Sequence, residues 1–210
     1  MKPQTNWRQL ITLIPVFGIL SFIILYIIAA LYYPGGSQAN KLSVGFSWAD
    51  NYWCNLLNEK AINGENNMAR PIAITAALIL SVSLSVFWFS FPVYIPFKKT
   101  GRLIIQVSGI LSMTLLIFLF TSLHDVIINV AGAFGLVAMT GVFIGLYRIK
   151  ANALLVFGFF NVLLIGLNNY IYHGSGSFIY LPVIQKLSFL SFLFWISMIS
   201  IALLKRQKEN

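Results

Sequence analysis

Six long apolar segments dominate this sequence and limit the folds that it can adopt. Each is long enough to cross a hydrocarbon core of about 30 Å, which takes roughly 20 residues in an α-helix. The segments are 10–33, 71–94, 103–121, 123–147, 151–172 and 178–204. We therefore predict an all-α polytopic membrane protein, a single bundle of six transmembrane helices over residues 1–210. The first segment exceeds the roughly 7–15 residues of a signal-peptide core, so we expect it to remain as an uncleaved span.

The composition indicates that lipid is the solvent for most of this chain. Hydrophobic residues make up 59% of it and charged residues 9%, whereas soluble domains carry about 25% charged residues. So few charges do not cover the surface of a water-soluble domain of this size. The formal net charge of +9 comes from residues near the ends of the apolar segments, so it reports orientation, and we expect no nucleic-acid partner. The single cysteine, Cys54, excludes an intramolecular disulfide.

Lysine and arginine residues predict the orientation of the spans. Ten lie on one side of the predicted membrane: Lys2, Arg8, Lys98, Lys99, Arg102, Arg148, Lys150, Lys205, Arg206 and Lys208. The other side has Lys41, Lys60, Arg70 and Lys186. Because short cytoplasmic connections carry the excess of Lys and Arg, we predict that the first side and both termini are cytoplasmic.

The predicted outer loop, residues 34–70, is the only sizeable segment outside the spans. It contains a Pro-Gly-Gly turn and an Asn-Gly turn. Ser47 followed by Asp50 is typical of a helix N-cap with an acidic partner, and Trp48 and Tyr52 begin an apolar series with a spacing of four. We expect a short amphipathic helix that lies at the outer interface or folds back over the bundle.

Small residues follow one side of the fourth segment. They are Gly132, Gly135, Ala138, Gly141 and Gly145. Small residues let helix backbones approach closely in lipid. Tight packing within the bundle is the favoured explanation, and a contact between two copies of the chain is the alternative. Ahead of this stripe, Ser122 with Asp125 predicts the N-cap of the fourth helix.

Polar residues in and near the spans gather toward the predicted outer side. Such residues are costly in lipid, so each needs a partner or a use. The candidates for an outer polar pocket are His124, Asp125, His173, Asp50, Glu59 and Lys186, and further candidate binding residues are Trp48, Asn51, Tyr52, Asn129, Asn161 and Asn168. Each type also has a structural explanation: histidines at helix ends, capping carboxylates, a snorkelling lysine, and asparagines that bond between helices.

The order of several short motifs resembles that of a known family. The first segment ends in Tyr32-Tyr33-Pro34-Gly35-Gly36, the loop contains Ser47-Trp48 and Asp50-Asn51-Tyr52, Asn66-Asn67 precede Arg70-Pro71, and Leu123-His124-Asp125 follows later. This order resembles a bacterial six-span membrane family that is a domain of unknown function, and it is distantly similar to the DRAM-like and FRAG-like six-span proteins. The resemblance covers nearly the whole chain and implies a protein of the bacterial cytoplasmic membrane.

The segment 48–52, Trp-Ala-Asp-Asn-Tyr, is also similar to the opening segment of the alkaline ceramidase-like intramembrane metal hydrolases. That group later carries a Ser and a His three residues apart and a closing His pair. Here the Ser and His are two residues apart, and only His173 stands in place of the pair. This resemblance implies zinc as an alternative cofactor. Its ligands would be His124, His173 and Asp125 or Asp50, and it would polarise water for attack on a lipid amide or ester.

These patterns leave three functional hypotheses. The first is a non-enzymatic protein without a cofactor that binds membrane lipids, or a membrane-protein partner, through the outer loop and pocket. It is favoured because the sequence has no Gly-x-Ser-x-Gly elbow and no His pair on one helix. The second is the lipid hydrolase. The third is a small-solute transporter, which Asn161 and Asn168 support because they lie seven positions apart and so share one helix face.

Overall fold

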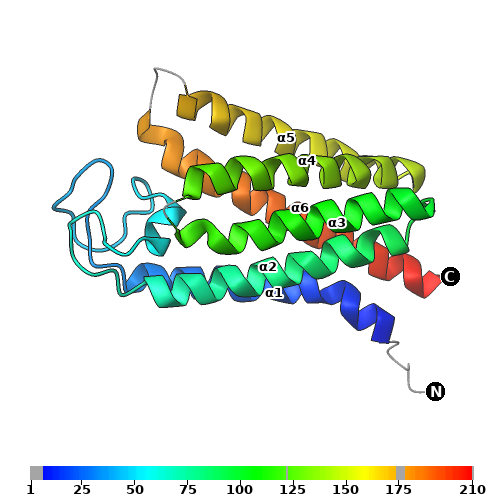
Figure 1. Cartoon of the computed structure of the whole chain (residues 1–210), viewed down its shortest axis with the longest axis horizontal. Helices are drawn as coiled ribbons and strands as arrows, with labels where there is room; N and C mark the ends of the chain where they lie inside the picture. The colour runs from blue at the N-terminus through cyan, green and yellow to red at the C-terminus, as the bar shows by residue number, and fades with distance from the viewer. Residues whose placement is uncertain (1–6, 122, 174–177, 210) are drawn as a thin grey trace. The chain divides into compact units, whose positions relative to one another are not determined.

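The computed structural model describes residues 7–121, 123–173 and 178–209. Its α-helices are α1 (Trp7–Leu31), α2 (Arg70–Ser90), α3 (Lys99–Leu116), α4 (His124–Arg148), α5 (Asn152–His173) and α6 (Leu181–Glu209), drawn in Figure 1. Short 3-10 helices are η1 (Trp53–Leu57), η2 (Phe91–Val93), η3 (Ile117–Phe120) and η4 (Phe178–Tyr180). The described residues form isolated β-bridges but no strand. The all-α prediction is confirmed.

Five of the described helices, all except α3, are long and apolar enough to cross a membrane. Helices of this kind are typical of a multi-pass membrane protein. α3 differs because its first turn carries Lys99 and Arg102, and the predicted third segment continues from α3 into η3. The residue that precedes α4 is Leu123, which has no side-chain acceptor for a cap. The predicted cap Ser122 lies outside the described residues.

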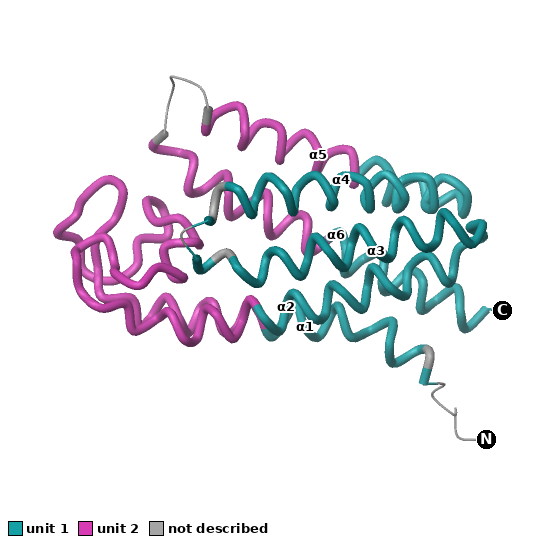
Figure 2. The backbone as a smooth tube through the Cα atoms, in the orientation of Figure 1, with its two compact units in different colours: residues 1–21, 78–157, 195–210 teal, residues 22–77, 158–194 magenta. Residues whose placement is uncertain are grey.

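The chain divides into two compact units, coloured separately in Figure 2. Unit 1 comprises Met1–Ser21, Leu78–Phe157 and Trp195–Asn210, and unit 2 comprises Phe22–Ala77 and Gly158–Phe194. All ten basic residues that were assigned to the cytoplasmic side belong to unit 1. The connection between α1 and α2, residues 32–69, belongs to unit 2 and is called the α1–α2 loop below.

In unit 1, small residues on α4 allow close packing against neighbouring elements. A Cβ atom on Gly141 would collide with the buried Ile105 side chain of α3, and one on Gly145 would lie 2.8 Å from the Phe91 ring. The packing role predicted for the stripe is therefore confirmed at these two glycines. Gly132 has open space beside it, with no heavy atom within 4 Å of the position of a Cβ. A contact between two copies of the chain stays a prediction.

Other contacts in unit 1 join helices that are distant in sequence. The buried Trp195 on α6 donates its indole N–H to the carbonyl of Leu154 on α5, at 2.7 Å. Gln207 near the end of α6 donates to the Thr12 hydroxyl on α1, at 2.9 Å. Such bonds leave fewer unsatisfied polar groups inside an apolar environment.

We predict that Gly109→Ala destabilises the protein by roughly 1–3 kcal/mol, as overpacking of a core usually does. Gly109 lies on α3, and an added Cβ would collide with the root of the buried Trp88 side chain on α2. The matched control is Gly132→Ala, whose methyl group enters open space and should stabilise the protein by up to about 1 kcal/mol, because alanine is preferred over glycine in a helix. Thermal unfolding in detergent measures both variants. Equal melting temperatures would contradict the close α2–α3 contact.

Candidate functional site

The α1–α2 loop is much longer than its connection requires. α1 and α2 are neighbours, because the Ser83 side chain occupies the space beside Gly18, and helix–helix connections usually take about 2–8 residues. Loops longer than roughly 12–15 residues inside compact domains are usually functional or disordered. This loop is held by its own hydrogen bonds, so it is the candidate functional site.

The first part of the loop is a tight hairpin. The main-chain N–H of Gly36 donates to the carbonyl of Ser43 at 2.7 Å. Gly36 has a φ of +83°, and a Cβ there would collide with the main chain of Ile62, so only glycine fits. The hairpin carries Leu42 and Val44, which are 89% and 96% exposed.

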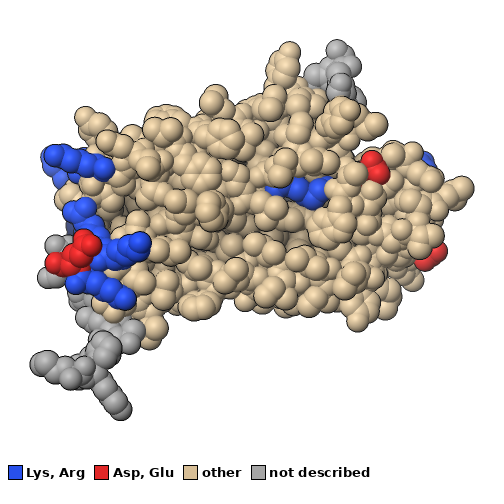
Figure 3. All heavy atoms as spheres, turned by 180° about the vertical axis from the view of Figure 1, so that it is seen from behind, with Lys and Arg blue, Asp and Glu red and all other residues tan. Residues whose placement is uncertain are grey.

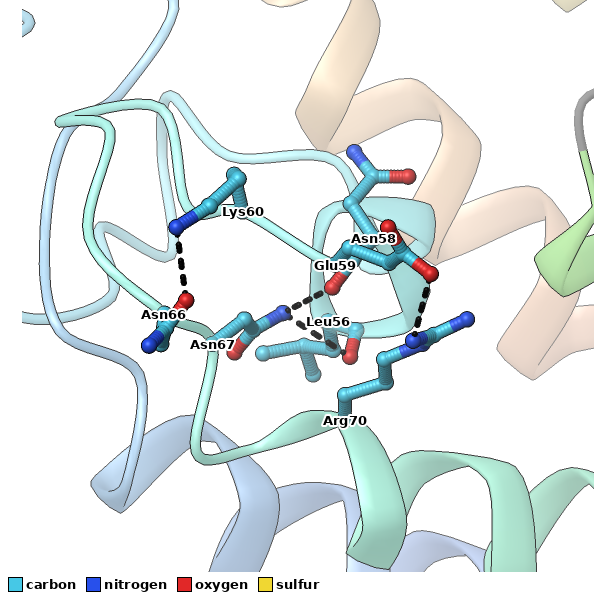
Figure 4. Close-up of polar contacts among 7 residues, drawn as sticks. All are labelled: Leu56, Asn58, Glu59, Lys60, Asn66, Asn67 and Arg70. Carbon is cyan, nitrogen blue, oxygen red and sulfur yellow. Dashed lines mark hydrogen bonds and ion pairs between the residues drawn. The ribbon is translucent and has the colours of Figure 1, made fainter.

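Asn67 fixes the second part of the loop. Its amide nitrogen donates to the carbonyls of Asn55 (3.1 Å), Leu56 (3.2 Å) and Asn58 (2.9 Å). Its amide oxygen accepts the N–H of Ala69 at 3.1 Å, just before α2 begins. Figure 4 shows Asn67 between η1 and the start of α2. One buried side chain thus connects the end of η1 to the N-terminus of a long helix.

Polar pairs on the surface brace the same region, as Figure 4 also shows. Arg70 forms an ion pair with Glu59 at 3.1 Å, and the Lys60 ammonium donates to the Asn66 side chain at 2.6 Å. Glu59 was a candidate for the polar pocket. The structure places it on the exposed side of the loop, with Arg70 as its partner.

The predicted amphipathic helix is not formed. The chain turns at residues 47–51, and only Trp53–Leu57 is helical, as the 3-10 helix η1. The helix N-cap predicted at Ser47 is therefore wrong, although the two side chains do pair: Ser47 Oγ donates to Asp50 Oδ2 at 2.7 Å and accepts the Asp50 N–H at 3.2 Å. That pair closes a turn here and does not start an α-helix.

Two asparagines fix the chain here, and the bond of Asn55 explains why the predicted helix does not continue. Asn51 Oδ1 accepts the N–H of Ser47 at 2.8 Å, and its Nδ2 donates to the Gly36 carbonyl at 2.8 Å. Asn55 Oδ1 accepts the N–H of Tyr52 at 2.7 Å. Asparagine side chains compete with helical hydrogen bonds in this way. Asn51, a candidate binding residue, is fully buried, and its amide is engaged within the loop.

The aromatic residues of the loop divide into a buried and an exposed group. Trp53 is 9% exposed, and its ring packs edge-on against Phe22 and Tyr26 of α1 and Phe189 of α6. Of the two predicted alternatives, folding back and lying at the interface, folding back is therefore correct for Trp53. Trp48 is exposed and meets Phe46 edge-on, whereas Tyr52 is half-buried.

Lys186 connects α6 to the loop from inside unit 2. It is only 7% exposed, and its ammonium donates to the carbonyl of Asn51 at 2.6 Å. Asp50 lies within electrostatic range of this cation. A buried ammonium without an acceptor is strongly unfavourable, so the carbonyl and the nearby carboxylate stabilise both the lysine and the position of the loop. The structure thus brings three candidates together: Asp50, Asn51 and Lys186.

Two further residues of this cluster did not emerge from the sequence. Gln185 accepts the main-chain N–H of Trp53 at 3.2 Å and bonds the thiol of Cys54. Burial raises the pKa of the Cys54 thiol, although Gln185 and the charge of Lys186 oppose the shift. The thiol is therefore protonated at neutral pH. The adjacent polar residues 185 and 186 in an otherwise apolar segment were the available signal.

The remaining asparagine candidates lie on different helices. Asn161 on α5 is fully buried, and Asn168 on α5 has a buried amide oxygen without a partner among the described residues. Asn129 on α4 is exposed and belongs to unit 1, whereas the other two belong to unit 2. A shared polar path along α5, which the transporter hypothesis requires, stays a prediction.

The candidate metal ligands cannot be assembled into a site from this structure. The side chains of His124, Asp125 and His173 lie outside the described residues, although the backbone places His124 and Asp125 in the first turn of α4 and His173 at the end of α5. Among the side chains that are described, no three from His, Cys, Asp and Glu gather closely enough to hold a metal ion.

No protein-family model matches this chain, and no curated protein or solved structure matches it either. We therefore infer the roles of the loop residues from their contacts within unit 2.

We predict that Asn67→Ala destabilises the loop and unit 2 by about 2–4 kcal/mol. The change leaves three carbonyls and one N–H without their partner, and each unsatisfied buried group costs about 1–3 kcal/mol before the loop relaxes. The matched control is its exposed neighbour in Asn66→Ala, which removes a single surface bond and should cost less than about 0.5 kcal/mol. Thermal unfolding and limited proteolysis at residues 58–66 measure the difference. If both variants were cleaved at the same rate, Asn67 would not hold the loop.

Proposed function

We propose that this protein is a binding protein of the bacterial cytoplasmic membrane. It crosses the bilayer six times with both termini in the cytoplasm, and it binds a lipid or a membrane-protein partner at the outer face. The observation that carries the proposal is the α1–α2 loop, which is fixed by buried hydrogen bonds and still presents exposed apolar side chains. The resemblance of its short motifs to those of the bacterial six-span family supports the location.

Helix lengths and charges support the six-span topology. Five helices are apolar and long enough, and α3 with η3 supplies the sixth. Residues 103–120 carry no charge and extend about 29 Å, at 1.5 Å per α-helical and 2.0 Å per 3-10 residue. This length is close to the hydrocarbon thickness of about 30 Å. The ten basic residues at the predicted cytoplasmic side support the orientation.

The contrast between the buried and exposed parts of the loop supports binding. Trp53, Asn51 and Lys186 are buried and keep the loop in one conformation, so little conformational entropy is lost when a ligand binds. Leu42 and Val44 face outward on the hairpin. Covering two such side chains contributes roughly 3–6 kcal/mol before the costs of association. A rigid scaffold that presents apolar side chains is typical of a binding surface.

We predict the topology from labelling of single cysteines. In a Cys54→Ser background, K41C places a cysteine on the hairpin and K98C places one before α3, and both positions are exposed. A membrane-impermeant maleimide should label K41C in intact cells and should label K98C only after permeabilisation. Labelling of K98C alone in intact cells would invert the proposed orientation.

We predict that a photoreactive amino acid in place of Leu42 crosslinks to one lipid or protein species in native membranes. The control position in the same loop is Met68, which is also exposed but does not belong to the hairpin, and it should not capture that species. Val156 on α5, exposed on an apolar helix, should give adducts with bulk lipid and shows that the chemistry works. Mass spectrometry of the adducts identifies the ligand. Adducts at Val156 without any at Leu42 would refute binding by the hairpin.

A further inference from the structure

Lys186 is the only charged residue in the stretch 181–204 of α6. On the face drawn in Figure 3, a recessed basic side chain is surrounded by uncharged residues. A cation inside an apolar helix is costly, so it is expected to have a use. The ammonium of Lys186 donates to a main-chain carbonyl, that of Asn51, and among the described residues the only ion pair joins Arg70 and Glu59. Lys186 thus holds the backbone of the loop and not a carboxylate.

α6 holds this part of the loop with consecutive residues. Lys186 donates to the carbonyl of Asn51 at 2.6 Å, and Gln185 accepts the main-chain N–H of Trp53 at 3.2 Å. The ring of Trp53 also packs against Phe189, about one turn further along α6, with 5.7 Å between the ring centroids. One face of a single helix therefore fixes three successive residues of the loop.

The turn at residues 47–51 connects this contact to the hairpin. Asn51 Nδ2 donates to the carbonyl of Gly36 at 2.8 Å. The carbonyl of Asp50 accepts the N–H of Gln38 at 3.4 Å. The turn therefore lies between α6 and the hairpin, with hydrogen bonds to both.

The hydrogen bonds continue across the hairpin itself. The N–H of Gly36 donates to the carbonyl of Ser43 at 2.7 Å, and Ser43 lies between the exposed residues Leu42 and Val44. A continuous series of hydrogen bonds thus runs from the ammonium of Lys186 to the apolar side chains of the hairpin. No part of this series lies outside unit 2.

The second part of the loop also contacts the hairpin, but at its base. The N–H of Ile62 donates to the Tyr33 hydroxyl at 3.0 Å, and the N–H of Asn63 donates to the carbonyl of Gly35 at 3.3 Å. Both acceptors precede Gly36. If the contact through the 47–51 turn were lost, these two bonds would keep the base attached and leave the residues beyond Gly36 less restrained.

We propose that Lys186 is a positioning residue that controls the hairpin from within α6. While its ammonium holds Asn51, Leu42 and Val44 stay in one arrangement. When the ammonium is withdrawn, the hairpin beyond Gly36 becomes mobile, and a ligand must then restrain it at a cost in affinity. The purpose of this control rests on the function proposed for the hairpin, whereas the contact itself can be tested without a ligand.

Hydrogen–deuterium exchange of the full-length protein in lipid nanodiscs measures the contact. Lys186→Met keeps a side chain of similar length and removes the donor to Asn51. We expect exchange in residues 36–46 to become at least about 10-fold faster, because a hydrogen bond from a charged group is lost. Exchange in residues 58–66 should change less than about 2-fold, since local openings involve contiguous units and Asn67 still holds this segment.

The matched control is Ser188→Ala on the same helix. Ser188 is also buried and polar, but its hydroxyl bonds the carbonyls of Ile184 and Leu164 and not the loop. This variant should leave exchange in residues 36–46 unchanged. Faster exchange there in Ser188→Ala, to the extent seen in Lys186→Met, would overturn the role of Lys186.

Asn51→Ala tests the route of the effect. It removes the bond to Gly36 but keeps the main-chain carbonyl that Lys186 uses. If Lys186 acts through Asn51, adding Lys186→Met to Asn51→Ala should accelerate hairpin exchange by less than about 2-fold, because effects on one network are not additive. Fully additive effects, or an equal acceleration in residues 58–66, would overturn the proposal.

Photocrosslinking from position 42 tests the control of binding. In the Lys186→Met background, the yield of the adduct should fall at least about 3-fold, because the mobile hairpin loses its preorganised surface. An unchanged yield together with faster exchange would overturn the control. Absence of adducts in the protein with Lys186 intact would instead refute the function proposed for the hairpin, and the exchange measurements would still decide the positioning role.

Discussion

An ammonium group inside an apolar helix must have an acceptor, and the α1–α2 loop provides one for Lys186. The Asn51 carbonyl accepts its hydrogen bond, and Asp50 lies within electrostatic range. The loop gains a fixed position from the same contact, with Trp53 inserted between α1 and α6. Lys186 needs the loop as its acceptor, and the loop needs Lys186 to fix its position. This explains how the long connection between α1 and α2 stays ordered with few helical residues. The exposed hairpin can then keep one conformation without burying its own apolar side chains.

The apolar segments were sufficient to predict the helices, because length and hydropathy decide which parts of a chain enter lipid. The loop was harder to predict. The spacing of Trp48, Tyr52 and Leu56 indicated a helix, but the side chain of Asn55 takes the N–H of Tyr52, which a helix would bond to the carbonyl of Trp48. That bond joins residues three positions apart, whereas Asn51 is also held by the Gly36 carbonyl, 15 positions away. The spacing of apolar residues alone does not reveal this competition for backbone hydrogen bonds.

The polar contacts also fall into two kinds. Those between sequence neighbours can be predicted from the sequence, and those between residues far apart in the chain cannot. The contact of Ser47 with Asp50 is local, so the sequence indicated it, although the helix that it was expected to start is absent. Lys186 and Asn51 are 135 positions apart in the chain. Residue spacing in the sequence does not indicate that two such distant residues are in contact. Cys54 and Gln185 were missed for that reason. The small residues of α4 predicted close packing, yet only the structure distinguishes Gly141, which faces Ile105, from Gly132, which faces open space.

The contacts of the loop with α6 also set an order of events during synthesis. The loop emerges from the ribosome early, whereas Gln185, Lys186 and Phe189 belong to the last long helix. Lys186 follows Asn51 by 135 positions. At a translation rate of roughly 5–20 residues per second, it is therefore synthesised about 7–27 s after the loop residue that it contacts. Trp53 and the neighbouring aromatic residues lack their partner Phe189 for that time. A chain that stops after α5 therefore inserts most of its spans and still lacks the residues that close its loop.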